Sequence, residues 1–118
     1  MKRLTLLSSV VAATLLLQPA LPARAATPDI HISAKNWAFT PSTITLHLNK
    51  PVKLVFVATE GIHGITIPDL GVNDVVNVGS SPSEIVVTPS KLGTFIAHCA
   101  VFCGTGHADM VLTIKVIK

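Results

Sequence analysis

The sequence is poor in charged residues, and no window of it repeats apolar residues with a helical period. Charged residues make up 13% of the 118 residues and hydrophobic residues 49%, which suits a folded core better than a disordered chain. The length allows one compact domain. Paired carboxylates, a nucleophile motif and a phosphate-binding glycine loop are all missing from the sequence. We therefore expect that this chain is not an enzyme by itself.

The first 25 residues have the pattern of a secretory signal peptide. Lys2 and Arg3 precede an uncharged apolar run over residues 4–17, and Ala23-Arg24-Ala25 fits a cleavage site with small residues at its first and third positions. We predict a signal peptide over residues 1–25, cleavage after Ala25, a mature domain over residues 26–118 and a periplasmic location. The alternative is an uncleaved segment that anchors the chain in a membrane.

The excess of positive charge lies in this N-terminal segment. The net charge of +3 matches the three basic residues Lys2, Arg3 and Arg24, so the basic and acidic residues of the predicted mature domain balance. The sequence also contains no basic patch with interleaved aromatic residues. We therefore expect no nucleic-acid partner.

The mature part has the pattern of short strands separated by turn residues. Seven segments are apolar or alternate between apolar and polar residues: 30–33, 44–48, 52–58, 65–67, 84–88, 94–99 and 110–117. Residues 52–58 are almost continuously apolar and predict a central strand buried on both faces. We interpret residues 69–83 as a long surface connection that could include a short strand, where a Greek-key crossover would run. The pattern predicts an all-β sandwich or barrel.

One segment near the C-terminus concentrates metal-binding residue types. Four donors occur there with the spacing C-x3-C-x3-H-x2-M: Cys99, Cys103, His107 and Met110. Thiolate and thioether ligands select copper, and imidazole also suits it. Gly104 and Gly106 allow the tight bend that turns these side chains inward. His63, which follows a predicted buried strand, is a fifth candidate that a sandwich could bring beside this loop.

With these residues the chain resembles the soluble copper domain of cytochrome c oxidase subunit II, the binuclear CuA cupredoxin. The match extends from residues 37–41 through residues 62–64 to the C-terminus. The resemblance implies a cupredoxin-like Greek-key β-sandwich with two copper ions. It implies the following ligands: bridging thiolates from Cys99 and Cys103, one histidine for each copper from His63 and His107, and weak ligands from Met110 and the backbone carbonyl of Val101.

The resemblance also implies electron transfer outside the cytoplasm, between a donor such as a c-type cytochrome and a terminal oxidase or reductase. The oxidase subunit usually has transmembrane helices before this domain, whereas here only the signal-like segment precedes it. We therefore expect a stand-alone monomer that is attached to a membrane only if the signal peptide is not cleaved. Val101 and Phe102 would supply an apolar rim for the redox partner.

Three alternatives use some of the same residues. A periplasmic copper carrier or metallochaperone would need the same ligands. A mononuclear blue-copper cupredoxin would bind copper through His63, Cys103, His107 and Met110 and would not need Cys99. A structural disulfide, common in exported proteins, would close a very small loop and leave the histidine and methionine unexplained.

The remaining candidate residues have structural explanations. Three histidines are out of phase with the buried residues of their strands and are expected outside the site: His31, His47 and His98. Trp37 and Phe39 are expected to pack in the core. Glu60 or Asp109 could orient a ligand histidine from behind, or could lie at the surface.

Overall fold

The computed structural model of the protein describes residues 16–23 and 26–118. Most of the predicted signal peptide, and the last residues before its predicted cleavage point, lie outside these ranges. Residues 16–23 form no helix or strand. Within the described ranges, the chain contains no helix with the length and apolar character needed to cross a membrane.

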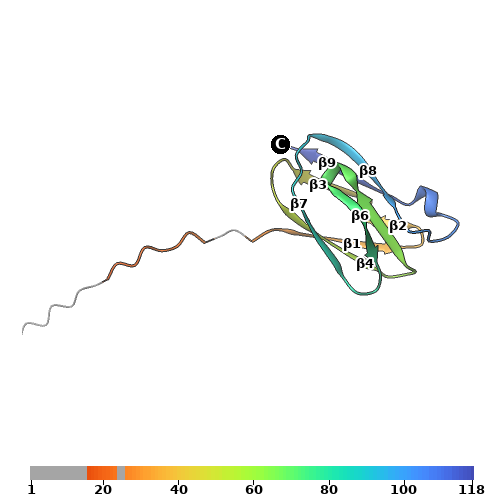
Figure 1. Ribbon diagram of the computed structural model, residues 1–118, viewed down its shortest axis with the longest axis horizontal. Helices are drawn as coiled ribbons and strands as arrows, with labels where there is room; N and C mark the ends of the chain where they lie inside the picture. The colour runs from red at the N-terminus through yellow and green to blue at the C-terminus, as the bar shows by residue number, and fades with distance from the viewer. Residues whose placement is uncertain (1–15, 24–25) are drawn as a thin grey trace, which may run out of the picture.

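The described part of the chain folds into nine strands that form two sheets packed face to face (Figure 1). The four-stranded sheet has the order β2 (Ala38–Thr40), β1 (Asp29–Lys35), β4 (Val52–Ala58) and β7 (Ser83–Val87). The five-stranded sheet has the order β3 (Thr43–His47), β9 (Val111–Ile117), β8 (Gly93–Cys99), β5 (His63–Ile67) and β6 (Val72–Val78). Two short 3-10 turns are present, η1 (Pro68–Leu70) and η2 (His107–Asp109). The predicted all-β sandwich is confirmed.

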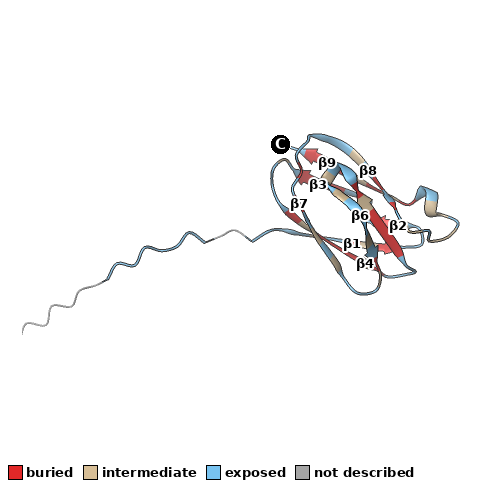
Figure 2. Ribbon diagram, in the orientation of Figure 1, coloured by how far each residue is buried: buried red, intermediate tan, exposed pale blue. Residues whose placement is uncertain are grey.

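Alternation along the strands places the core between the two sheets, as the buried stripes in Figure 2 show. In β9, Leu112 and Ile114 are fully buried, while Lys115 faces solvent. The rings of Phe39 and Phe56 meet edge to face, with centroids 6.4 Å apart. Phe39 therefore lies in the core as predicted. β4 runs between β1 and β7, which confirms its central position.

The segment over residues 69–83 differs from the prediction. It contains a full strand, β6, which pairs with β5 at the edge of the five-stranded sheet. Its central residues Asn73, Asp74 and Val75 are exposed, so the apolar alternation that would reveal a strand is weak. The chain then changes sheets over residues 79–82, between β6 and β7. The predicted crossover thus occupies only the end of the segment.

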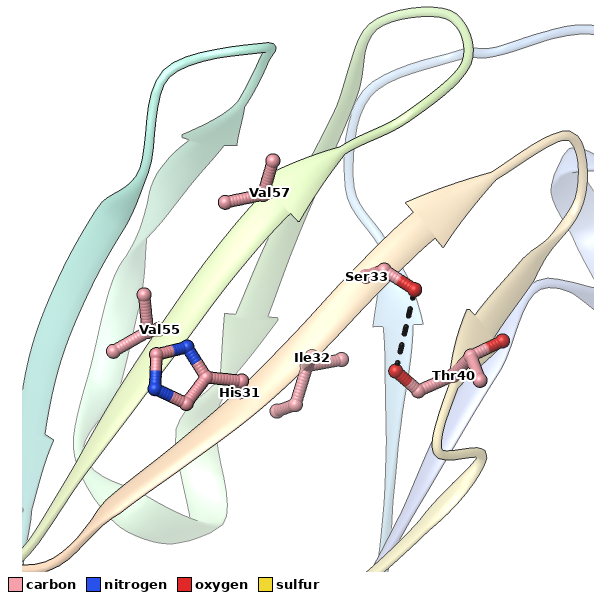
Figure 3. A pocket seen from close by; sticks show the side chains of 6 residues that line it. All are labelled: His31, Ile32, Ser33, Thr40, Val55 and Val57. Atoms are coloured by element: carbon pink, nitrogen blue, oxygen red, sulfur yellow. Dashed lines mark hydrogen bonds between the residues drawn. The ribbon is translucent and has the colours of Figure 1, made fainter.

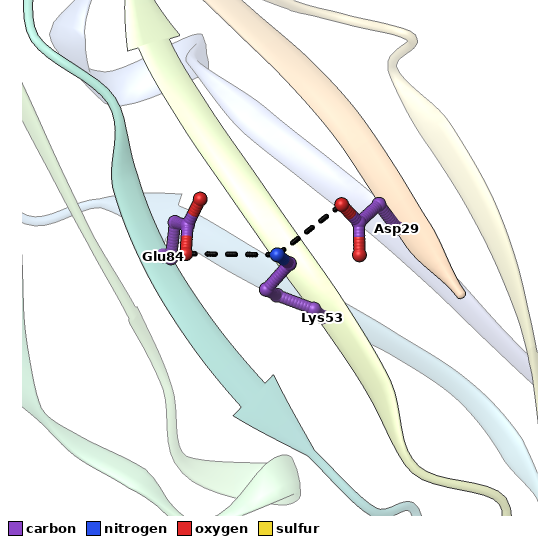
Figure 4. A network of polar contacts seen from close by, with 3 residues as sticks. All are labelled: Asp29, Lys53 and Glu84. Carbon is purple, nitrogen blue, oxygen red and sulfur yellow. Dashed lines mark ion pairs between the residues drawn. The ribbon is translucent and has the colours of Figure 1, made fainter. Parts of the chain in front are cut away.

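An ion-pair network links three neighbouring strands of the four-stranded sheet (Figure 4). Lys53 Nζ on β4 lies 3.2 Å from Asp29 Oδ2 on β1 and 3.6 Å from Glu84 Oε2 on β7. The hydrogen bond and charge of Asp29, followed by the charge of Glu84, raise the pKa of Lys53 above its ordinary value. These groups are accessible to solvent, so the network contributes little to stability.

A hollow lies over β1, β2 and β4 (Figure 3). Six residues line it: His31, Ile32, Ser33, Thr40, Val55 and Val57. Ser33 Oγ donates a hydrogen bond to the Thr40 carbonyl at 3.4 Å. The exposed position of His31 agrees with its predicted solvent-facing role. None of the predicted metal ligands borders this hollow.

Candidate metal centre

The loop over residues 100–110 joins β8 to β9 and lies beside the start of β5. In Figure 1 this loop, drawn in blue, projects from the end of the sandwich away from the C-terminus. The Cys99 amide donates to the Met110 carbonyl at 3.0 Å, which closes the base of the loop, and the Ala100 amide donates to the Gly64 carbonyl at 2.9 Å. A Cβ atom at Gly64 would stand 2.5 Å from Val101 Cγ2. Glycine beside His63 therefore lets the loop reach β5.

The two cysteines are free thiols that face each other at this end. Their sulfur atoms lie 3.6 Å apart, well beyond the length of about 2.05 Å in a disulfide. Cys99 is buried and Cys103 is half-buried. Burial, followed by the hydrogen bond and charge of Cys99, raises the pKa of Cys103 to about 11. The Cys103 thiol is therefore protonated at neutral pH, and binding of a metal to its sulfur would release that proton.

His63 is fully buried and presents one ring nitrogen to the cysteines. Its Nε2 lies 2.8 Å from the Glu60 carbonyl oxygen, and its Nδ1 lies 4.0 Å from Cys99 Sγ. A carbonyl oxygen only accepts hydrogen bonds, so Nε2 carries the proton and donates it. Nδ1 is then left with a free lone pair directed toward the thiols. A backbone contact behind the ring thus sets the tautomer that a metal ligand needs.

The other side of the site is built by the η2 turn. His107 Nδ1 lies 3.6 Å from Cys103 Sγ, and Met110 Sδ lies 3.8 Å from the same sulfur. Met110 is fully buried, whereas His107 is half-buried and its ring lies 5.4 Å from that of exposed Phe102. On the first side, the Val101 carbonyl oxygen lies 3.2 Å from Cys99 Sγ.

All six predicted site residues therefore meet around two sulfur atoms. His63 and the Val101 carbonyl lie next to Cys99, while His107 and Met110 lie next to Cys103. Within the described residues, the ligand atoms of His63, Cys99 and Cys103 are all within 4.8 Å of one another. The side-chain donors are sulfur and imidazole, with no carboxylate among them. This donor set fits copper and does not fit magnesium or calcium.

Trp37 differs from its prediction, while Glu60 lies at the surface, which is one of the two placements left open for it. Trp37 does not lie in the core: it is 40% exposed, and its Nε1 donates to the Cys103 carbonyl at 2.8 Å. Glu60 does orient His63, but through its backbone carbonyl and not its carboxylate. Asp109 and His98 are exposed, and no hydrogen bond in the described chain joins either to the predicted ligands. No local sequence pattern signals the Trp37 contact, because it spans 66 residues.

The comparisons identify the family. A profile of the cupredoxin-like domain matches residues 6–113, and the chain therefore belongs to the cupredoxin-like family.

Its relatives include cytochrome c oxidase subunit 2 proteins, which confirms the resemblance predicted from the ligand loop. The probable cytochrome c oxidase subunit 2 of Streptomyces coelicolor is 36% identical over 77 residues, covering 64% of this chain and 24% of that protein. The Saccharomyces cerevisiae subunit 2 is 27% identical over 82 residues, covering 67% of this chain and 31% of that protein. The chain thus spans less than a third of the length of these two relatives.

Solved structures agree on the fold. The periplasmic domain of subunit II of cytochrome oxidase from Bradyrhizobium japonicum superimposes with a TM-score of 0.70 at 19% identity, covering 80% of this chain and 87% of that one. The metal binding domain of the Cu(I) exporting P-type ATPase of Streptococcus pneumoniae D39 gives a TM-score of 0.56 at 20% identity, covering 76% and 85%. At these identities the comparisons establish the cupredoxin-like sandwich alone.

Proposed function

We propose that this chain is a copper-binding electron-transfer protein with a binuclear site. The observation that carries the proposal is the division of four further donors, two on each side, around two facing thiols 3.6 Å apart. Cys99 and Cys103 would bridge two copper ions. His63 Nδ1 and the Val101 carbonyl would bind one ion, and His107 Nδ1 and Met110 Sδ the other. Two copper ions held in this way would supply one-electron transfer, with the change of charge spread over both ions and the surrounding side chains kept in place.

The protein's own part is to keep these donors in place. Strand ends and a closed loop supply them, and His63 is fixed by the Glu60 carbonyl, so little side-chain reorganisation accompanies a change of charge. Burial of Cys99, His63 and Met110 keeps water away from most of the site. Half-buried His107 gives the site one edge near the surface, where a partner protein can approach.

The partner we propose is a small redox protein such as a c-type cytochrome, with a terminal oxidase or reductase as acceptor. Phe102 is 78% exposed beside His107 and offers an apolar contact, as suits a weak and short-lived encounter. The protein would act as a monomer in the periplasm after cleavage behind Ala25. It would pass electrons without transforming a small molecule itself.

Copper analysis of the purified domain, combined with stopped-flow mixing, tests this function. We expect two coppers per chain and rapid electron exchange between the reduced domain and an oxidised c-type cytochrome. A site that binds copper, exchanges no electrons with any redox protein and delivers its copper to an apo copper protein would instead identify a carrier. One copper per chain, unchanged in Cys99→Ser, would identify a mononuclear site.

A further inference from the structure

The turn between β1 and β2 belongs to the four-stranded sheet, yet it contacts both segments that carry the proposed ligands. Trp37 in this turn donates its Nε1 hydrogen to the Cys103 carbonyl at 2.8 Å. That carbonyl belongs to the ligand loop of the other sheet. The contact therefore links the two sheets at the candidate metal centre.

The indole ring lies directly against the backbone of the ligand loop. A Cβ atom at Gly106 would stand 2.5 Å from Trp37 Cγ, and one at Gly104 would stand 2.9 Å from Trp37 Nε1. Gly104 also has a φ of +120°, which side chains rarely allow. Both glycines lie between the proposed ligands Cys103 and His107. The ring therefore restrains the part of the loop that contains these two glycines.

Asn36 makes the corresponding contact on the His63 side. Its Nδ2 donates to Glu60 Oε1 at 3.4 Å, and its Oδ1 lies 2.8 Å from the place where a Cβ at Gly61 would stand. The Glu60 carbonyl is the group that accepts the hydrogen bond from His63 Nε2. Asn36 therefore packs against the turn that fixes the orientation of the buried histidine.

We infer that Asn36 and Trp37 are positioning residues that hold both ligand segments in their metal-binding arrangement before any metal arrives. This inference rests on the copper binding proposed above. Ordering a loop that contains two glycines costs conformational entropy. The contacts of Asn36 and Trp37 order the loop during folding, so metal binding does not have to order it. Copper then binds a preformed site and leaves it slowly, because release gains little additional loop freedom.

The test compares Trp37→Phe with wild type, because phenylalanine keeps an aromatic ring but removes the N–H donor together with part of the packed indole. Leu92→Ala is the matched control: Leu92 is an exposed apolar residue beside Gly93, at the opposite end of β8 from Cys99. Because one ordinary hydrogen bond is lost, copper release to a Cu(I) chelator should be about fivefold faster in Trp37→Phe than in wild type. The rate of copper release from Leu92→Ala should equal the wild-type rate. Asn36→Ala should also speed release.

Hydrogen exchange in the metal-free protein gives a second measurement that needs no copper. Trp37 is the single tryptophan, so its indole N–H gives one assignable NMR signal, and we expect that proton to exchange more slowly than in a free peptide. The amides of His107 and Asp109 donate to the Gly104 and Gly106 carbonyls at 3.2 Å. They should exchange about fivefold faster in Trp37→Phe, while amides of β3 and β9 keep their wild-type rates.

Several results would overturn the inference. The first is an indole proton in the wild-type protein that exchanges as fast as in a free peptide. The second is a Trp37→Phe variant whose loop amides exchange, and whose copper is released, at the wild-type rates. The third is equal acceleration of loop and strand amides in that variant, which would mean general destabilisation. If Trp37→Phe does not fold, two other measurements decide the inference: the exchange rate of the wild-type indole proton and the rate of copper release from Asn36→Ala. If wild type binds no copper, the proposed function fails, but the metal-free exchange measurements still decide the positioning role.

Discussion

Replacing Met110 by leucine tests whether Met110 tunes the proposed copper site while the cysteines and histidines hold the metal. Met110 is fully buried, and its sulfur lies 3.8 Å from Cys103 Sγ. Leucine has nearly the same volume, so the folding free energy should fall by less than about 1.5 kcal/mol. For a domain of this size, each kcal/mol lowers the melting temperature by roughly 4–8 °C. The domain should therefore stay folded at room temperature.

Copper content should also stay unchanged in Met110→Leu, because both thiols and both imidazoles remain. A thioether is a weak axial ligand at copper–thiolate sites and adjusts the reduction potential. Leucine offers the oxidised site no donor, so we expect a more positive potential; a tenfold weaker preference for the oxidised state corresponds to about 59 mV. Metal analysis and voltammetry measure both quantities, with Cys103→Ser as the variant expected to lose the binuclear site. Equal copper loss in Met110→Leu and Cys103→Ser would refute this ranking of the ligands.

Three further predictions concern other parts of the molecule. Phe102→Glu should slow electron exchange with a c-type cytochrome in stopped-flow mixing while copper content stays at the wild-type value; an unchanged rate at both low and high salt would place docking elsewhere. Gly106→Ala should destabilise the domain by about 1–3 kcal/mol in thermal unfolding, because the added Cβ would stand 2.5 Å from Trp37 Cγ. Gly79→Ala, with open space around the added atom, is its control, and equal losses would contradict the packing argument. Mass spectrometry of the exported protein should find Ala26 as the first residue; an intact chain in the membrane would show that the segment is an anchor.

Short-range patterns predict most of this fold and identify the residues proposed here as ligands. The alternation of apolar and polar residues predicts β3 and β9, because one face of each strand is buried. It does not predict β6, an edge strand whose polar residues face solvent. The spacing of Cys99, Cys103 and His107 is local, so the sequence alone points to them.

The groups that support the ligands could not be predicted in the same way. The hydrogen bond from Trp37 to Cys103 joins two sheets across 66 residues, and no periodicity distinguishes such a tryptophan from one in the core. The partner of His63 Nε2 is a backbone carbonyl, which every residue carries. The sequence therefore points to the carboxylate of Glu60, whereas in the structure its backbone carbonyl oxygen accepts the hydrogen bond from His63. Side-chain chemistry points to candidate ligands, whereas the groups that hold those ligands in place are found only in the folded structure.

Copper stoichiometry with an EPR spectrum of the purified wild-type domain tests the central claim most directly. Two facing thiols flanked by two imidazoles predict two coppers per chain and a hyperfine pattern from one unpaired electron shared equally by two copper nuclei. Cys99→Ser should abolish that pattern. One copper per chain, with a spectrum from a single nucleus that Cys99→Ser leaves unchanged, would contradict the binuclear site.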